Sequence, residues 1–189
     1  MEKSGVVRDA FLRRGHDAVS CDLEDIRSPG PHRKGDVFTF DWAGFDLLIM
    51  HPECTYLASS GLHWNRRVEG RAQKTEEALE FVARLWGLPC GKKALENPIG
   101  CLSTRWRKPD QIIQPWQFGD DASKATCLWL EGLPLLRHTN VMPGGAKARR
   151  ANQTPNGQNK LGPSPMRKEL RSNTYAGIAN AMAEQWGGL

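Results

Sequence analysis

The sequence lacks three features that would each define a class of protein. It has no run of 18 consecutive apolar residues, so we expect no membrane span. Residues 1–5 carry no apolar signal region, so we expect no secretion and a cytoplasmic location. The five cysteines are odd in number and form no C-x-x-C pair. This argues against a disulfide framework or a cysteine-rich zinc site and favours free thiols in a reducing compartment.

The composition is that of an ordinary globular protein. Charged residues make up 25% and hydrophobic residues 39% of 189 residues, and seven Trp and six Phe can support a core, which excludes whole-chain disorder. The net charge of +5 is unevenly spread, because residues 140–173 hold seven Lys or Arg and one acid. Such a basic segment predicts contact with phosphates, although a solvated loop has the same composition.

Apolar periodicity predicts an α/β fold. The expected elements are helices at 6–14, 72–86 and 174–186, strands at 18–21, 45–50 and 93–95, a loop at 27–34, and a helix or turn at 123–130. This order is typical of a mostly parallel sheet covered by helices, here without the first strand that usually opens such folds. We expect an α/β core at 1–139, a basic Pro/Gly-rich segment at 140–173, and a helix at 174–189 that packs on the core.

Polar residues follow three of the expected strands. In parallel sheets, ligands bind beyond the carboxyl ends of the strands, where this chain has Asp22, Cys54 and Glu96. An accessible Cys54 thiol could act as a nucleophile, whereas a buried structural cysteine is the alternative. Glu96 could hydrogen-bond a base edge or move a proton, whereas a turn before Pro98 is the alternative. We expect the three residues to converge on one cleft.

A second pattern resembles zinc nucleobase deaminases. His51 and Glu53 match their H-x-E motif, and Cys90 after a proline matches the start of P-C-x-x-C. The second cysteine of that motif would fall at position 93, which is Lys93. A three-ligand zinc site cannot be completed in this way, and Cys101 is a poor substitute, so we expect no metal.

Aromatic residues lie among cations in two places. Trp64 is followed by Arg66 and Arg67, and Trp106 follows Arg105. Such a mixture can stack bases and hold phosphates, although most tryptophans belong to a core. We expect Trp64 and Trp106 to be exposed, and the tryptophans at 116 and 129 to be buried.

Several motifs follow one another in a familiar order. They are SGVVRDAF at 4–11, GHDA at 15–18, SCDL at 20–23, HPECTYL at 51–57 and ALENP at 94–98. Together they resemble those of DNA cytosine-5 methyltransferases, and more closely those of the short methyltransferase-like proteins encoded by bacteriophages. The resemblance to the phage group covers nearly the whole chain. It implies a Rossmann-like methyltransferase sandwich and a cytoplasmic location in the bacterial host.

The resemblance also implies S-adenosylmethionine as the methyl donor. Ser4 and Gly5 would lie under the methionine part of that cofactor. Asp22 would accept hydrogen bonds from the ribose hydroxyls. Asp36 would lie near the adenine.

The target that the resemblance implies is cytosine in DNA. Cys54 would add to carbon 6 of the base, and Glu96 would hydrogen-bond the ring and make it more electrophilic. Contacts with the substrate are expected from Asn97, Arg105, Arg149 and Arg150.

Departures from the family pattern keep a second hypothesis open. Glu53 replaces the usual proline before the catalytic cysteine, and a carboxylate there opposes thiolate formation. The first strand is missing, and there is no room for a separate target-recognition domain. The alternative is therefore a non-catalytic module that binds a nucleotide or nucleic acid, such as an anti-defence protein. A second copy of the chain could add a strand at the open sheet edge.

Overall fold

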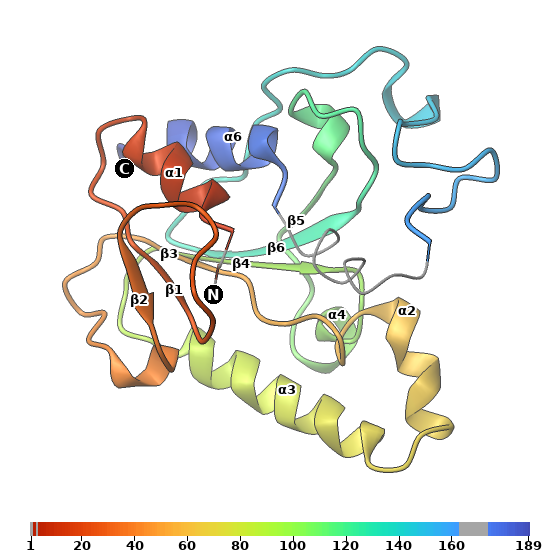
Figure 1. Cartoon of the computed structure of the whole chain (residues 1–189), viewed down its shortest axis with the longest axis horizontal. Coiled ribbons are helices and arrows are strands. Elements are labelled where there is room, and N and C mark those ends of the chain that lie inside the picture. Colours follow the sequence, from red (N-terminus) through yellow and green to blue (C-terminus); the bar gives the residue numbers. More distant parts are fainter. Residues whose placement is uncertain (1, 3, 163–173) are drawn as a thin grey trace. The chain divides into compact units, whose positions relative to one another are not determined.

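The computed structural model describes residues 2, 4–162 and 174–189, and these form two compact units (Figure 1). The sheet unit comprises residues 35–113 and 125–135. The terminal unit comprises residues 2–34, 114–124 and 136–189, apart from the undescribed positions. Each unit is assembled from segments far apart in the sequence, so this division differs from the expected regions with boundaries at 139 and 173. The two units are described separately.

A four-stranded sheet forms the centre of the sheet unit. Its strands, in spatial order, are β3 (Leu48–Met50), β4 (Lys93–Pro98), β6 (Thr126–Glu131) and β5 (Gln111–Ile113). The pair β3–β4 is parallel, whereas β4–β6 and β6–β5 are antiparallel. The fold is α/β as expected, but this sheet is mixed rather than mostly parallel.

Strand β6 causes that difference. Residues 123–130 were expected to form a helix or turn, but Thr126–Glu131 is a strand that pairs with β4 at six successive positions. Five of its six residues are buried. Periodicity alone does not distinguish a buried strand from a buried helix in a short apolar run. Here the pairing with the distant strand β4 determines that a strand forms.

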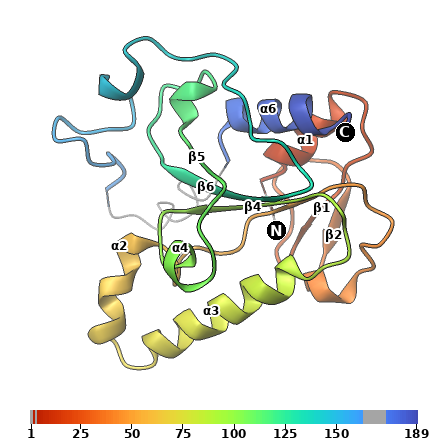
Figure 2. The same cartoon turned by 180° about the vertical axis from the view of Figure 1, so that it is seen from behind.

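Helices complete the sheet unit. In chain order, these helical elements are the 3₁₀ turn η1 (Val37–Thr39), α2 (Ser59–Leu62), the 3₁₀ turn η2 (His63–Arg66), α3 (Arg71–Trp86) and α4 (Leu102–Arg105). Helix α3 runs along one face of the sheet and buries Val82 and Leu85 (Figures 1 and 2). Trp106 was expected to be exposed, but its side chain is half-buried. The reason is that it lies between Trp86 and the buried Trp129, with ring centroids 5.3 and 5.8 Å away.

The terminal unit is built around a pair of helices. Its elements are α1 (Val6–Leu12), β1 (Ser20–Asp22), β2 (His32–Lys34), the 3₁₀ turns η3 (Pro115–Gln117) and η4 (Gly145–Lys147), and α6 (Ala176–Trp186). Helices α1 and α6 lie side by side and bury their apolar faces (Figure 2). No helix in the described part of the chain is long and apolar enough to cross a membrane.

Strand β1 belongs to a different sheet from β3 and β4. It pairs in parallel with β2, and these two strands form a two-stranded sheet of their own. Asp22 at the end of β1 therefore does not end a strand of the sheet that carries Glu96. The expectation that Asp22, Cys54 and Glu96 all follow strands of one sheet was therefore wrong for Asp22.

Candidate functional site

The parallel register of β3 and β4 brings the residue after β3 beside Glu96 in the second half of β4. Met50 pairs with Leu95, so the next positions along the two chains are His51 and Glu96. The ring Nδ1–H of His51 donates to Oε2 of Glu96 at 3.1 Å. Their side chains are only 11% and 10% exposed. Glu96 is thus held at the sheet end by a nearly buried histidine.

The next pair of positions is also connected. The side-chain Nδ2–H of Asn97 donates to the carbonyl oxygen of Pro52 at 2.9 Å, and Asn97 is 1% exposed. Asn97 therefore fixes the chain just before Cys54, and its burial assigns it to positioning the loop. The direct contact with substrate that was expected of Asn97 stays a prediction.

Backbone hydrogen bonds close the Cys54 loop onto the segment that follows β4. The amide of Leu57 donates to the carbonyl of Cys54 at 3.1 Å. The amide of Ser59 donates to Ile99, and that of Cys101 donates to Leu57, both at 2.9 Å. The loop with the proposed nucleophile and the strand with the proposed acid therefore form one connected piece of backbone.

The Cys54 side chain is half-buried, and its neighbour Glu53 is exposed. The carboxylate of Glu53 accepts a hydrogen bond from the hydroxyl of Thr55 at 2.7 Å. Helix α3 supports the same loop, because the guanidinium of Arg71 donates to the Thr55 carbonyl at 2.9 Å. The loop is fixed by side chains as well as by its own backbone.

Two buried polar atoms at this sheet end have no hydrogen-bond partner among the described residues. They are Nε2 of His51 and Oδ1 of Asn97. Buried polar groups are nearly always paired, and an exception at a candidate site indicates a missing partner such as a ligand or a water molecule. These atoms and Glu96 make this sheet end the strongest candidate site of the sheet unit.

The residues expected to bind a cofactor are divided between the units. Ser4, Gly5 and Asp22 belong to the terminal unit, and Asp36 belongs to the sheet unit. Asp22 is half-buried and accepts the amide of Glu24 at 3.1 Å. Asp36 is exposed and caps η1.

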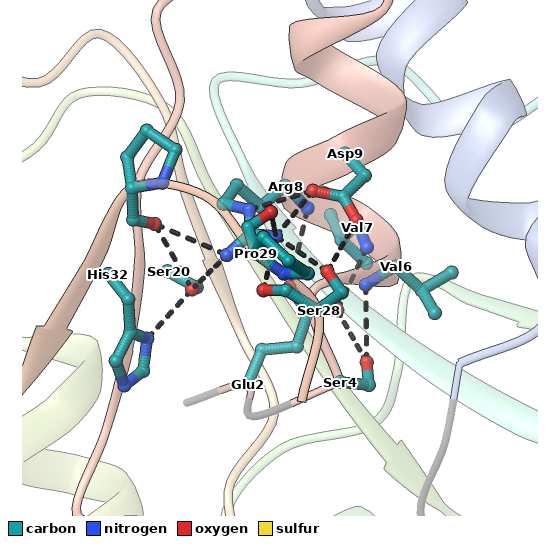
Figure 3. Close-up of polar contacts among 11 residues, drawn as sticks. Glu2, Ser4, Val6, Val7, Arg8, Asp9, Ser20, Ser28, Pro29 and His32 are labelled. Atoms are coloured by element: carbon teal, nitrogen blue, oxygen red, sulfur yellow. Dashed lines mark hydrogen bonds and ion pairs between the residues drawn. The ribbon is translucent and has the colours of Figure 1, made fainter. Parts of the chain in front are cut away.

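The first turn of α1 holds a carboxylate, that of Glu2 (Figure 3). Its oxygens accept hydrogen bonds from the amides of Val7 at 2.8 Å and Arg8 at 3.3 Å, and from the Ser4 hydroxyl at 2.7 Å. Gly5 has a φ of 76°, and a Cβ there would lie 2.5 Å from the Ser28 hydroxyl oxygen. The amides of this turn are therefore already bound by the carboxylate of Glu2, and binding of a cofactor carboxylate here stays a prediction.

Arg8 anchors this part of the terminal unit. Its buried guanidinium lies 2.5 Å from the Asp9 carboxylate and donates to the carbonyls of Ser28 and Pro29 at 3.2 and 3.1 Å (Figure 3). The hydroxyl of Ser28 donates to the other oxygen of Asp9 at 2.7 Å. These contacts fasten the loop before β2 to α1.

The arginines expected to contact the substrate differ in what they already bind. Arg105 makes a two-pronged ion pair with Glu76 at 2.9 and 2.8 Å, which lowers the pKa of Glu76. Arg150 is buried, stacks on Trp116 at 5.3 Å and donates to backbone carbonyls, so it does not fit the expected phosphate contact. Arg149 is exposed.

Part of the basic segment lies outside the described residues. This part is 163–173, and it holds three of the seven Lys or Arg residues counted in 140–173. The expectation that this segment contacts nucleic acid therefore stays a prediction.

The pairing of His51 with Glu96 was missed from the sequence, where His51 was considered only as a zinc ligand. The available signal was that each directly follows the apolar part of its strand, so that the two lie at matching positions of neighbouring parallel strands. In the described ranges, no group of three or more His, Cys, Asp or Glu side chains could hold a metal ion.

Comparisons of the chain with known proteins found no relative. No family model matches it, no curated protein matches it, and no solved structure matches it. The resemblance to cytosine methyltransferases therefore remains a hypothesis that rests on the motifs.

Proposed function

We propose that the protein acts on cytosine in DNA, with Cys54 as the nucleophile, Glu96 as the acid that binds the ring, and S-adenosylmethionine as the methyl donor. The observation that supports this proposal is the set of side-chain contacts between the segment before Cys54 and strand β4. His51 contacts Glu96, and Asn97 holds Pro52, both within the sheet unit. A nucleophile and an acid on one connected backbone keep a constant spacing, which this chemistry requires.

The proposed chemistry begins with addition of the thiolate of Cys54 to carbon 6 of the ring. As the carbon–sulfur bond forms, the 5,6 double bond shifts to the 4,5 position, the 3,4 electron pair moves to N3, and the protonated carboxyl of Glu96 gives N3 its proton, which leaves carbon 5 electron-rich as part of an enamine. After methylation of carbon 5, loss of its proton to water allows the carbon–sulfur bond to break, which restores the ring and the thiolate, and N3 returns its proton to Glu96. The His51 N–H fixes the orientation of the Glu96 carboxyl group. S-adenosylmethionine, when bound, supplies an electrophilic methyl group.

A second candidate function is binding of a nucleotide or nucleic acid without methyl transfer. The observation that favours it is Glu2, which already binds the amides in the first turn of α1. A methionine carboxylate would have to displace it. Glu53 beside Cys54 favours the same alternative, because a neighbouring carboxylate opposes formation of the thiolate.

A transfer assay distinguishes the two functions. Labelled S-adenosylmethionine and cytosine-rich DNA are incubated with the wild type, Cys54→Ala, Glu53→Pro and the control Cys90→Ala, which removes another half-buried thiol of the sheet unit. We expect label in DNA with the wild type and with Cys90→Ala, and none with Cys54→Ala. Activity that survives Cys54→Ala contradicts the covalent mechanism. A folded wild type and a folded Glu53→Pro that both bind DNA and both fail to transfer support the binding module.

A further inference from the structure

The segment after the Cys54 loop presents an exposed aromatic side chain. We call residues 59–74 the Trp64 arm; it consists of α2, η2 and the start of α3 (Figure 1). Trp64 is 44% exposed and Val68 is 48% exposed. The ring of His63 lies 4.9 Å from the indole in a tilted arrangement. A large planar side chain so exposed is available to a partner with a planar face.

The charge of the Trp64 arm is strongly positive. It contains the cations Arg66, Arg67, Arg71 and Lys74 against the single acid Glu69. All of these cations except Arg71 are exposed, and the guanidinium of Arg67 lies 5.7 Å from the centre of the Trp64 ring. A partner must therefore be an anion that also offers flat aromatic faces, and nucleic acid combines both properties.

The Trp64 arm is held in place before any partner binds. The side-chain Nδ2–H of Asn65 donates to the Thr75 hydroxyl at 2.9 Å, and that hydroxyl donates to the Tyr56 carbonyl at 3.0 Å. Arg71 and Lys74 lie over the Tyr56 ring at 4.9 and 5.6 Å. Tyr56 is two residues from Cys54, so the arm is fastened to the loop that carries the thiol.

We propose that the Trp64 arm binds a single strand of DNA, with a base stacked on the Trp64 indole and the adjacent phosphates near Arg66, Arg67 and Lys74. A base can stack on a side chain only where its face is uncovered, and within a duplex both faces are covered by neighbouring bases. This inference rests on the proposed function for the choice of DNA and for the target base beside Cys54. The binding itself requires no methyl transfer.

The test measures binding alone, in a Cys54→Ala background that cannot form an adduct. Fluorescence anisotropy of a short labelled oligodeoxynucleotide of cytosine and thymine is compared with that of the same strand annealed to its complement. The variants are Trp64→Ala and Trp64→Phe, with Ile112→Ala as the control, because Ile112 is an equally exposed apolar residue of the sheet unit outside the arm. Arg67→Gln is compared with Lys108→Gln, which removes another exposed cation of this unit.

We expect tighter binding of the single strand than of the duplex. Trp64→Ala should weaken binding about 5- to 100-fold, Trp64→Phe should retain most of it, and Ile112→Ala should change nothing. Arg67→Gln should reduce the slope of log affinity against log salt by about 0.7, and Lys108→Gln should not. Unchanged binding by Trp64→Ala, or equal binding of duplex and single strand, overturns the inference. If the single strand binds through Trp64 but the transfer assay shows no activity, only the proposed enzymatic function fails.

Discussion

The imidazole of His51 lies 3.1 Å from the carboxylate of Glu96, and both side chains are nearly buried where β3 has just ended beside its parallel neighbour β4. The contact arises directly from strand register, because the pairing of Met50 with Leu95 makes His51 and Glu96 the next neighbours. The Nε2 atom of the same ring has no hydrogen-bond partner in the described part of the chain. His51 thus connects the carboxylate to a position where a further polar group can bind.

Replacing His51 should affect both stability and reaction. His51→Ala leaves a nearly buried carboxylate with one donor fewer, so we expect the free energy of unfolding to fall by about 1–3 kcal/mol. Methyl transfer should fall as well, because Glu96 loses its fixed orientation. The control is His63→Ala, an exposed histidine of the same unit. Equal unfolding curves in urea for His51→Ala and wild type would show that the contact contributes nothing.

The cysteines should differ in reactivity. Burial raises the pKa of the Cys101 and Cys127 thiols, so near neutral pH they carry even less thiolate than an ordinary cysteine. We expect iodoacetamide to alkylate the half-buried Cys54 and Cys90 in the folded protein, and all five cysteines in urea. Peptide mass spectrometry measures the order of modification. A Cys54 as protected as Cys127 would contradict its assignment as the nucleophile.

Glu2 should compete with the proposed cofactor. In Glu2→Gln the first turn of α1 no longer holds a carboxylate, so S-adenosylmethionine should bind about tenfold more tightly, equivalent to about 1.4 kcal/mol. Titration calorimetry measures this directly, without reference to activity. Asp17→Asn is the control, because it removes an exposed acid of the same unit. Equal or weaker binding by Glu2→Gln would remove the first turn of α1 from the cofactor hypothesis.

The ion pair of Asp9 and Arg8 should make stability depend on pH. Burial alone would raise the pKa of Asp9, but hydrogen bonds from Ser28 and Arg8 and the charge of Arg8 together hold it below its usual value. A carboxyl with a lowered folded-state pKa stabilises the fold above its unfolded pKa, and this contribution is lost as the pH falls below about 4. Asp9→Asn should therefore lose stability at neutral pH and show a flatter dependence below about pH 4. Urea midpoints across that range provide the measurement.

Arg149 and Arg150 should behave differently although they are adjacent. Arg150→Gln removes a buried guanidinium from the carbonyls of Pro143 and Gly145, so we expect a loss of about 1–3 kcal/mol in the free energy of unfolding. Arg149→Gln should leave stability unchanged. If the segment 140–173 contacts DNA, only Arg149→Gln should weaken binding and reduce its salt dependence without unfolding the protein. An unchanged salt slope for Arg149→Gln assigns this part of the segment to solvent.

Sequence periodicity predicted the elements whose stability is mainly local. The helix expected at 72–86 begins at Arg71 and ends at Trp86, and the helix expected at 174–186 spans Ala176–Trp186. Both have a continuous apolar face. The strands at 45–50 and 93–95 were also found, with ends at Leu48–Met50 and Lys93–Pro98.

Features that depend on distant pairing could not be predicted in the same way. β6 is a strand because β4 offers it six backbone partners, and β2 lies in the expected loop at 27–34 because β1 pairs with it. In the candidate site, Glu96 was expected directly after a strand at 93–95 but lies within β4, which extends to Pro98, and Cys54 lies in the loop after β3. Their connection through His51 and Asn97 became visible only with the strand register. The burial of Arg150 follows from its stacking on Trp116, 34 positions away in sequence, and no local pattern signals it.

Gly100 makes the backbone bridge between the Cys54 loop and the end of β4 possible. A Cβ at this position would collide with the carbonyl of Leu57, where the two segments form a bridge between Ala58 and Gly100. Because backbone atoms form the bridge between Ala58 and Gly100, most side chains around it can be replaced without moving the Cys54 thiol relative to the Glu96 carboxylate. The spacing of Cys54 and Glu96 should therefore be insensitive to most surface substitutions, whereas a side chain at Gly100 would push the two segments apart.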